Sequence, residues 1–183
     1  GSLGPRNDLR AVKLEHKMGI HASPTCVMAY GDDDNCTGYL LGHECGGMKA
    51  MFTMMNHARI NVGLQGYAIA ERALQHAAAY AATRVQSAKF GGGREPVAII
   101  EHVDVRRMLA TGRALVEAAR AIGLVNAAAV DRAHAEPEPD LRAEAQGLAD
   151  LLTPVTKAFS TDIGVEVTSL AVQVFGGMGY IEE

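Results

Sequence analysis

No proline interrupts residues 47–86, and this stretch limits the possible folds more than any other feature of the sequence. Met48, Met51, Phe52 and Met55 fall at i, i+3, i+4 and i+7, which places them on one face of an α-helix. A helix of about 40 residues would be roughly 60 Å long at 1.5 Å per residue. Because an average globular helix is much shorter, the stretch predicts a large helical bundle rather than a small compact domain.

The apolar face continues beyond Met55, but two glycines lie within the predicted helix. Glycine in a helix interior costs about 1 kcal/mol relative to alanine. We therefore expect a neighbouring helix or a ligand to approach closely at Gly63 and Gly66. The positions that continue the apolar face, less regularly, are Val62, Tyr67, Ile69, Leu74 and Ala78.

A second long helix is predicted over residues 102–135, after a flexible glycine-rich connector at residues 91–96. It should end before Pro137 and Pro139, because proline restricts the residue before it and cannot donate a helix hydrogen bond. Its inward positions are expected to be Val105, Met108, Leu109, Leu115, Ala119, Ile122 and Val125.

A third helix is predicted from Leu141 toward Phe175, with Asp140 as its N-cap. Pro154 lies inside this stretch, where we expect a kink or a break. Gly176 and the glycine after it should end the helix.

Residues 1–45 have a different pattern, in which short apolar runs alternate with turn residues. Residues 24–30 are predicted to form a strand, residues 31–35 its turn, and residues 37–41 a second short strand. Two or three strands do not make a stable sheet alone. We therefore expect residues 1–45 to be the last strands of an incomplete β-domain.

The predicted fold is therefore mainly α: an incomplete antiparallel bundle of three long helices, preceded by a short β remnant. Residues 46–183 would form the bundle domain, itself incomplete. Three such helices leave apolar surface exposed, so a fourth helix or a partner subunit should cover it.

Composition excludes several function classes. A formal net charge of −4 gives no attraction to nucleic acid or to an anionic membrane. No apolar run reaches the ~18 residues of a membrane span, and residues 1–6 do not resemble a signal peptide. With no tryptophan and 5% aromatic residues, alanine and methionine must supply much of the packing.

Cysteine usage predicts neither a disulfide framework nor a metal site. The three cysteines are Cys26, Cys36 and Cys45, an odd number without a C-x-x-C pair, and His43 alone stands near them. A structural zinc site requires four close ligands. We expect reduced thiols, as in a cytoplasmic protein.

Five segments follow one another in a fixed order: residues 17–25 (K-M-G-I-H-A-S-P-T), 42–48, 56–59 (N-H-A-R), 84–86 (R-V-Q) and 171–180 (A-V-Q-V-F-G-G-M-G-Y). Together they resemble the acyl-CoA dehydrogenases, from the end of the middle β-domain into the C-terminal helical domain. One glycine motif alone would be a weak signal, but five segments in order are a strong one. Residues 15–25, 54–59 and 100–109 further resemble a branch that includes the 3-methylmercaptopropionyl-CoA dehydrogenases.

The resemblance implies FAD-dependent α,β-dehydrogenation of an acyl-CoA thioester. In this family a carboxylate removes the α-proton, and preorganised donors polarise the thioester carbonyl. FAD takes the β-hydrogen as hydride, and the protein positions it.

The resemblance gives this chain no catalytic base. In most members the base lies in a Y-E-G-T loop after the Gly-Gly segment, and in a minority it occupies the position of Ala58. We therefore expect residues 1–183 to be inactive alone. The alternative base is Glu182 or Glu183, although a carboxylate at a chain end is neither desolvated nor oriented.

On the substrate side, the resemblance implies roles for Asn56, Arg59 and Ser23. The Asn56–Arg59 segment would meet the CoA end or the thioester region. The alternative for Arg59 is an ion pair across the bundle. Ser23 and Thr25 would face substrate and flavin, unless they are simply two hydroxyl groups on a strand.

The cofactor residues implied by the resemblance come from three segments. Arg84 and Gln86 would contact the FAD pyrophosphate, which a guanidinium can bind through two parallel hydrogen bonds. His102 and Val103 would lie near the adenine, unless His102 is a helix cap or a surface group. The usual Phe-Gly after the Arg-x-Gln segment is replaced by Ser87 and Ala88, a departure from the family pattern beside the implied adenosine pocket. Gln173, Gly176, Gly177 and Gly179 would line the FAD of a neighbouring subunit, where backbone amides approach closely.

The implied partners are an acyl-CoA substrate, an electron acceptor such as an electron-transfer flavoprotein, and further copies of the chain in a homo-oligomer (dimer or tetramer). The predicted location is the cytoplasm. Two alternatives stay open: an acyl-CoA oxidase, and a non-catalytic relative that binds flavin or serves as an oligomerisation bundle.

Overall fold

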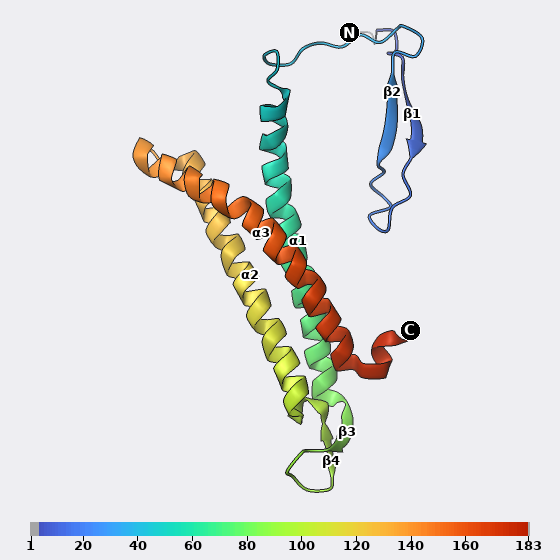
Figure 1. The fold of residues 1–183 in the computed structure, drawn as a ribbon, viewed down its shortest axis with the longest axis vertical. Helices are drawn as coiled ribbons and strands as arrows, with labels where there is room; N and C mark the ends of the chain where they lie inside the picture. Colours follow the sequence, from blue (N-terminus) through green and yellow to red (C-terminus); the bar gives the residue numbers. More distant parts are fainter. Residues whose placement is uncertain (1–3, 183) are drawn as a thin grey trace. The chain divides into compact units, whose positions relative to one another are not determined.

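The computed structural model describes residues 4–182, so Glu183 lies outside the described residues. The chain separates into two compact units between Met48 and Lys49, and each is described by itself. The first unit contains a β-hairpin and the second contains three long helices (Figure 1). The mainly α fold predicted from the sequence is confirmed.

In the first unit, strand β1 (Leu9–Leu14) pairs antiparallel with strand β2 (Cys26–Tyr30). The register shifts between Ala11 and Lys13, which leaves one extra residue in β1 and keeps its later side chains in phase with β2. One face of the hairpin is therefore apolar. It carries Leu9, Ala11 and Leu14 opposite Tyr30, Met28 and Cys26.

Residues 37–41 do not form a strand, so this prediction is wrong. Strand β2 pairs instead with β1, which comes before β2 in the chain. Thr37 is instead fastened by side-chain bonds: the Asn7 amide donates to the Thr37 carbonyl at 2.9 Å and accepts from its backbone N–H at 3.1 Å. An extended segment held by a side chain needs no ladder partner.

The second unit contains helices α1 (Gly47–Thr83), α2 (Val103–Ala135) and α3 (Pro139–Phe175) in antiparallel succession (Figure 1). Helix α1 ends three residues earlier than predicted. The chain then forms strand β3 (Val85–Ala88), which pairs antiparallel with strand β4 (Pro96–Ala98).

The predicted flexible connector is therefore the loop of a small hairpin. A 3₁₀ turn η1 (Ile99–Glu101) joins this hairpin to α2.

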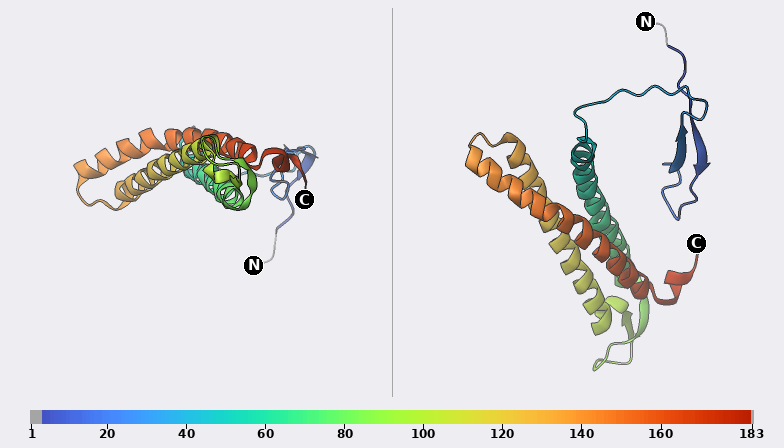
Figure 2. Two further views of the ribbon diagram at one scale, coloured as in Figure 1. Left: turned by 90° about the horizontal axis from the view of Figure 1, so that it is seen from below. Right: turned by 45° about the horizontal axis from the view of Figure 1, so that its top comes forward.

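Helix α3 differs from its prediction at its start and at Pro154. Glu138 is the N-cap and Pro139 is in the first turn, where its missing N–H is tolerated, so Asp140 is not the cap. The helix continues through Pro154 without a break and is visibly curved (Figure 2). It ends at Gly176 as predicted, and a 3₁₀ turn η2 (Gly176–Tyr180) follows.

The core between the helices is built mostly from alanine and other small residues. Methionine shares this packing at Met108, as predicted, whereas the prediction is wrong for Met48, which is 62% exposed, and Met51, which is 37% exposed. Val125, predicted to face inward, is exposed as well. Small residues occupy the positions between the helices because they let the helix backbones approach closely. The buried apolar positions are Ala70, Leu74, Ala77, Ala81, Val116, Ala119, Ala129, Ala145, Ala149, Ile163, Val167, Ala171 and Val174, with Ile99 from η1.

Gly66 shows how close that approach is. A Cβ atom built at this position would overlap the carbonyl oxygen of Ser160 on α3. The close contact predicted at the two glycines of α1 is therefore confirmed, and the neighbour is a helix. Gly63 is similar, since a Cβ there would lie 2.9 Å from Thr156.

Candidate functional site

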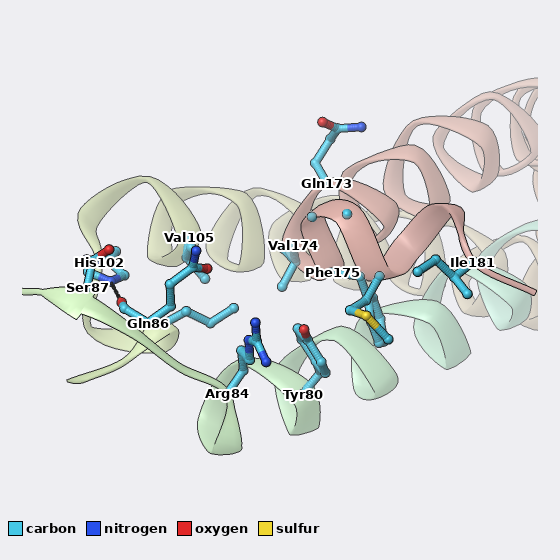
Figure 3. Close-up of a pocket in the computed structure, with 14 residues that line it drawn as sticks. Tyr80, Arg84, Gln86, Ser87, His102, Val105, Gln173, Val174, Phe175 and Ile181 are labelled. Atoms are coloured by element: carbon cyan, nitrogen blue, oxygen red, sulfur yellow. Dashed lines mark hydrogen bonds between the residues drawn. The ribbon is translucent and has the colours of Figure 1, made fainter. Parts of the chain in front are cut away.

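Residues at one end of each of the three helices line an open cavity of about 710 Å³. Its walls come from segments far apart in the sequence: the last turn of α1 with β3, the junction of η1 and α2, and the end of α3 with η2. Figure 3 shows these segments facing one space. The lining residues are Tyr80, Arg84, Gln86, Ser87, Ile99, His102, Val105, Gln173, Val174, Phe175, Gly176, Gly177, Met178 and Ile181.

Arg84 gives this cavity a positive charge. Its backbone N–H continues α1 by donating to the Tyr80 carbonyl at 2.9 Å, and its carbonyl accepts from Ile99 at 2.8 Å. Within residues 4–182 its guanidinium forms no ion pair, and no carboxylate is among the lining residues. An unpaired guanidinium at a cavity without acidic groups suits an anionic ligand.

The three glycines in residues 176–179 differ in the structural constraint that requires glycine at each position. Gly176 ends α3 with φ of +60°, a conformation that disfavours other residues. A Cβ at Gly179 would lie 2.7 Å from the Val172 carbonyl oxygen, and Gly179 does not line the cavity. Neither reason applies to Gly177, which lines the cavity and has open space where a Cβ would be. Gly177 therefore leaves room for a ligand to approach its backbone.

Two polar side chains that line the cavity are held in place by the protein. The Gln173 amide donates to the Tyr180 hydroxyl at 3.1 Å. The His102 ring lies 2.8 Å, through Nε2, from the carbonyl oxygen of Gln86 (Figure 3). Val103, predicted beside His102, is 76% exposed and does not line the cavity.

The structure thus brings together Arg84, Gln86, His102, Gln173, Gly176 and Gly177, six of the residues predicted to bind a cofactor. Tyr80 and Phe175 also line the cavity but were not among the site residues predicted from the sequence. A signal for Tyr80 existed, since it stands four residues before Arg84 and so shares its helix face.

The predicted substrate residues lie elsewhere. The Arg59 guanidinium donates to the Asn56 side chain at 2.8 Å and lies 5.6 Å from the centre of the Phe52 ring. Asn56 lines a separate cavity of about 490 Å³, whose lining also includes His57, His134 and Asp150. Their substrate role stays a prediction.

Ser23 and Thr25 belong to the first unit, and both are exposed. The Lys17 ammonium donates to the carbonyls of Ile20 and Ser23, and the Thr25 carbonyl accepts from Glu15 at 2.8 Å. These bonds shape the loop before β2. The roles of Ser23 and Thr25 toward flavin and substrate stay predictions.

Residues 46–183 match the family model described as "Acyl-CoA dehydrogenase, C-terminal domain". The chain belongs to the acyl-CoA dehydrogenase family. This confirms the family predicted from the five ordered segments.

Among curated relatives of this acyl-CoA dehydrogenase chain, the 3-methylmercaptopropionyl-CoA dehydrogenase of Ruegeria pomeroyi is 52% identical over the whole chain. This similarity confirms the predicted resemblance to that branch. The match covers 31% of the Ruegeria protein, so the chain spans about a third of the length of this relative.

Two solved structures share the fold with a TM-score of 0.69 over 94% of the chain and 40% of theirs. One is the butyryl-CoA dehydrogenase of Megasphaera elsdenii, at 29% identity. The other is a chain, at 30% identity, in a structure of the electron transferring flavoprotein of Acidaminococcus fermentans.

Within residues 4–182, none of the helices combines the length and the hydropathy needed to cross a membrane. The same residues contain no group of three or more His, Cys, Asp or Glu side chains arranged to hold a metal ion.

Proposed function

We propose that this chain is part of an FAD-dependent acyl-CoA dehydrogenase and that its large cavity binds the adenosine diphosphate portion of FAD. The observation that carries the proposal is the meeting of Arg84, Gln86 and Gly177 in one cavity that no carboxylate lines. Because the glycine segment resembles one that lines the FAD of a neighbouring subunit, the bound cofactor would belong to a second copy of the chain.

The chemistry of the cavity fits this group. The Arg84 guanidinium would hold the diphosphate through two parallel hydrogen bonds. The backbone at Gly177 can approach phosphate or ribose because no side chain intervenes. The amides of Gln86 and Gln173 can donate to or accept from the sugar and the phosphates.

FAD, when bound, supplies the hydride acceptor for α,β-dehydrogenation of an acyl-CoA thioester. In our proposal this chain orients the cofactor through its adenosine end. Asn56, Arg59 and Ser23 would contact the substrate, and Thr25 the flavin. His102, and Val103 at the start of α2, would lie on the adenine side.

We further propose that residues 1–183 lack the catalytic base. Ala58 occupies the position that carries the base in a minority of relatives. Glu182 is exposed, so it is not desolvated as a general base requires, and Glu183 lies outside the described residues. The base would then come from another part of the parent enzyme.

The proposed partners follow from the same account. The parent enzyme would pass electrons to an electron-transfer flavoprotein, which the similarity to a chain in the Acidaminococcus structure supports. It would act as a homo-oligomer, since two copies must meet to complete each FAD site. The proposed location is the cytoplasm, where the free thiols of Cys26, Cys36 and Cys45 would stay reduced.

The proposal is tested by the visible absorption of bound flavin and by the rate of acyl-CoA oxidation. Purified residues 1–183 should be colourless and inactive, because one wall of a site does not retain FAD stoichiometrically. The full protein that contains them should copurify with FAD and reduce an electron acceptor in the presence of an acyl-CoA. A stoichiometric flavin band in the isolated chain would contradict the first expectation. A full protein that holds FAD but oxidises no acyl-CoA would contradict the second.

A further inference from the structure

Strand β3, which follows Arg84 and contains Gln86, includes a strained position. Ser87 has φ of +59°, in the left-handed region that residues other than glycine rarely adopt. The pairing of β3 with β4 is also irregular between Val85 and Ala88. Such a conformation persists only where surrounding contacts hold it, and these positions gather at ligand-binding sites.

His102 supplies a contact that holds this segment. Its Nε2 lies 2.8 Å from the carbonyl oxygen of Gln86, the residue directly before the strained Ser87. A carbonyl oxygen only accepts hydrogen bonds, so Nε2 must carry a proton and donate it. This hydrogen bond fixes the peptide that links Gln86 to Ser87.

The His102 ring is attached to a rigid base. The His102 backbone N–H donates to the Ile99 carbonyl at 3.0 Å, and its carbonyl accepts from Arg106 in the first turn of α2 at 3.0 Å. The Ile99 N–H in turn donates to the Arg84 carbonyl at 2.8 Å. The backbone on both sides of Val85 is thus tied to the start of α2.

We propose that His102 is a positioning residue, whose ring holds β3 in its strained form so that Arg84 and Gln86 are directed into the cavity. This inference rests on the proposed function, because it explains how the proposed diphosphate site is preorganised. His102 would act through the backbone of Gln86, whereas a direct contact with the adenine would act on the ligand itself.

Ser87 allows these two roles to be separated. Glycine adopts a positive φ without steric cost, so Ser87→Gly should remove the strain that the His102 bond offsets. If His102 acts by positioning, Ser87→Gly should compensate for loss of the imidazole. If His102 contacts the ligand directly, it should not.

The experiment measures ADP binding to the 183-residue protein by calorimetry, with four variants. We expect His102→Leu to weaken ADP binding about fivefold, which is about 1 kcal/mol. His102→Gln keeps an N–H donor and should bind within about twofold of the unmodified protein, as should the double variant S87G/H102L. Glu101→Gln is the matched control, because it breaks the neighbouring exposed pair with Lys89 and should leave binding unchanged. Failure of S87G to rescue H102L would overturn the proposal.

A second measurement needs no ligand. In His102→Leu, the amide hydrogen of Ile99 should exchange about fivefold faster, since its acceptor on Arg84 is no longer held. The Arg106 amide, which donates to the His102 backbone, is the internal reference and should exchange at the same rate. If the unmodified protein does not bind ADP, the proposed function fails while Ile99 exchange still tests the positioning role. Equal exchange of Ile99 in both proteins would overturn that role.

Discussion

Tyr80 and Phe175 stack with their ring centroids 4.5 Å apart and their planes inclined by 25°. Tyr80 lies in the last turn of α1, four residues before Arg84, and Phe175 directly precedes Gly176 at the end of α3. Both rings line the cavity, so their stack joins its two principal walls. The spacing between the Arg84 guanidinium and the Gly177 backbone therefore depends on this pair.

Replacing Phe175 with leucine should loosen this junction. Loss of an aromatic pair costs about 1 kcal/mol beyond the area it buries. We expect Phe175→Leu to lower the free energy of unfolding by roughly that amount and to weaken ADP binding severalfold. Denaturant unfolding and calorimetry measure the two effects. Phe90→Leu is the matched control, because Phe90 is 97% exposed and should change neither quantity.

Arg84 is the predicted anion ligand. Arg84→Gln removes the charge but keeps an amide, and we expect ADP binding to weaken about tenfold, as is typical for loss of a charge-assisted hydrogen bond. Arg107→Gln is the control, since Arg107 pairs with the exposed Asp104 and does not line the cavity. Equal losses in the two variants would point to general electrostatic attraction and against a specific site.

Gly177 and Gly179 should separate binding from folding. Gly177→Ala places a methyl group in open space beside the cavity, so stability should stay within about 0.5 kcal/mol while ADP binding falls. Gly179→Ala places one 2.7 Å from the Val172 carbonyl oxygen, so it should destabilise the turn by about 1–3 kcal/mol. Thermal unfolding and ADP titration of both variants test this contrast. The reverse pattern would mean that Gly177 serves packing and not the ligand.

Glu71 should make stability depend on acidic pH. A hydrogen bond from Gln75, followed by the charges of Arg113 and Arg120, lowers the pKa of its carboxyl below the ordinary 4.5. Because the folded pKa is lowered, the contribution is complete above the ordinary pKa and is lost as pH falls through the folded value. Urea unfolding should therefore show less stability at about pH 3 than at neutral pH.

The Glu71→Gln variant tests the source of that effect. It should lose about 1 kcal/mol at neutral pH, where the network joins α1 to α2, and should lose less between neutral pH and about pH 3 than the unmodified protein does. Gln146→Ala is a suitable control on α3, because its exposed bond to Asp150 lies outside this network. An identical pH dependence in Glu71→Gln and the unmodified protein would exclude Glu71 as the cause.

The long helices could be predicted because their periodicity and their proline and glycine boundaries are local properties of the sequence. The residues that form the core were predicted less accurately. Hydropathy favoured Met48 and Met51 as inward residues, whereas the contact between α1 and α3 selects glycine and alanine for size, as Gly66 shows. Strand β1 was missed because the turn residues at 31–35 suggested a partner after β2. The true partner, β1, lies before β2 and is joined to it by the long connection of residues 15–25.

The candidate site was predicted in part because its residues came from ordered segments. Sequence order could not show that Arg84 and Gly177 share one cavity, since that depends on how α1 and α3 end side by side. Nor could it distinguish Gly177 from Gly179, because the difference is the position of the Val172 carbonyl.

The most direct test of the account is a titration of the 183-residue protein with ADP, followed through its backbone amide resonances. We predict saturable shifts at Gly176, Gly177 and Gln86, with a dissociation constant in the millimolar range for half of a shared site, about −4 kcal/mol. Arg84→Gln should reduce these shifts at equal ADP concentration. No saturable shift at these amides, or shifts confined to the residues around Asn56 and His134, would contradict the proposal that this cavity binds the adenosine diphosphate of FAD.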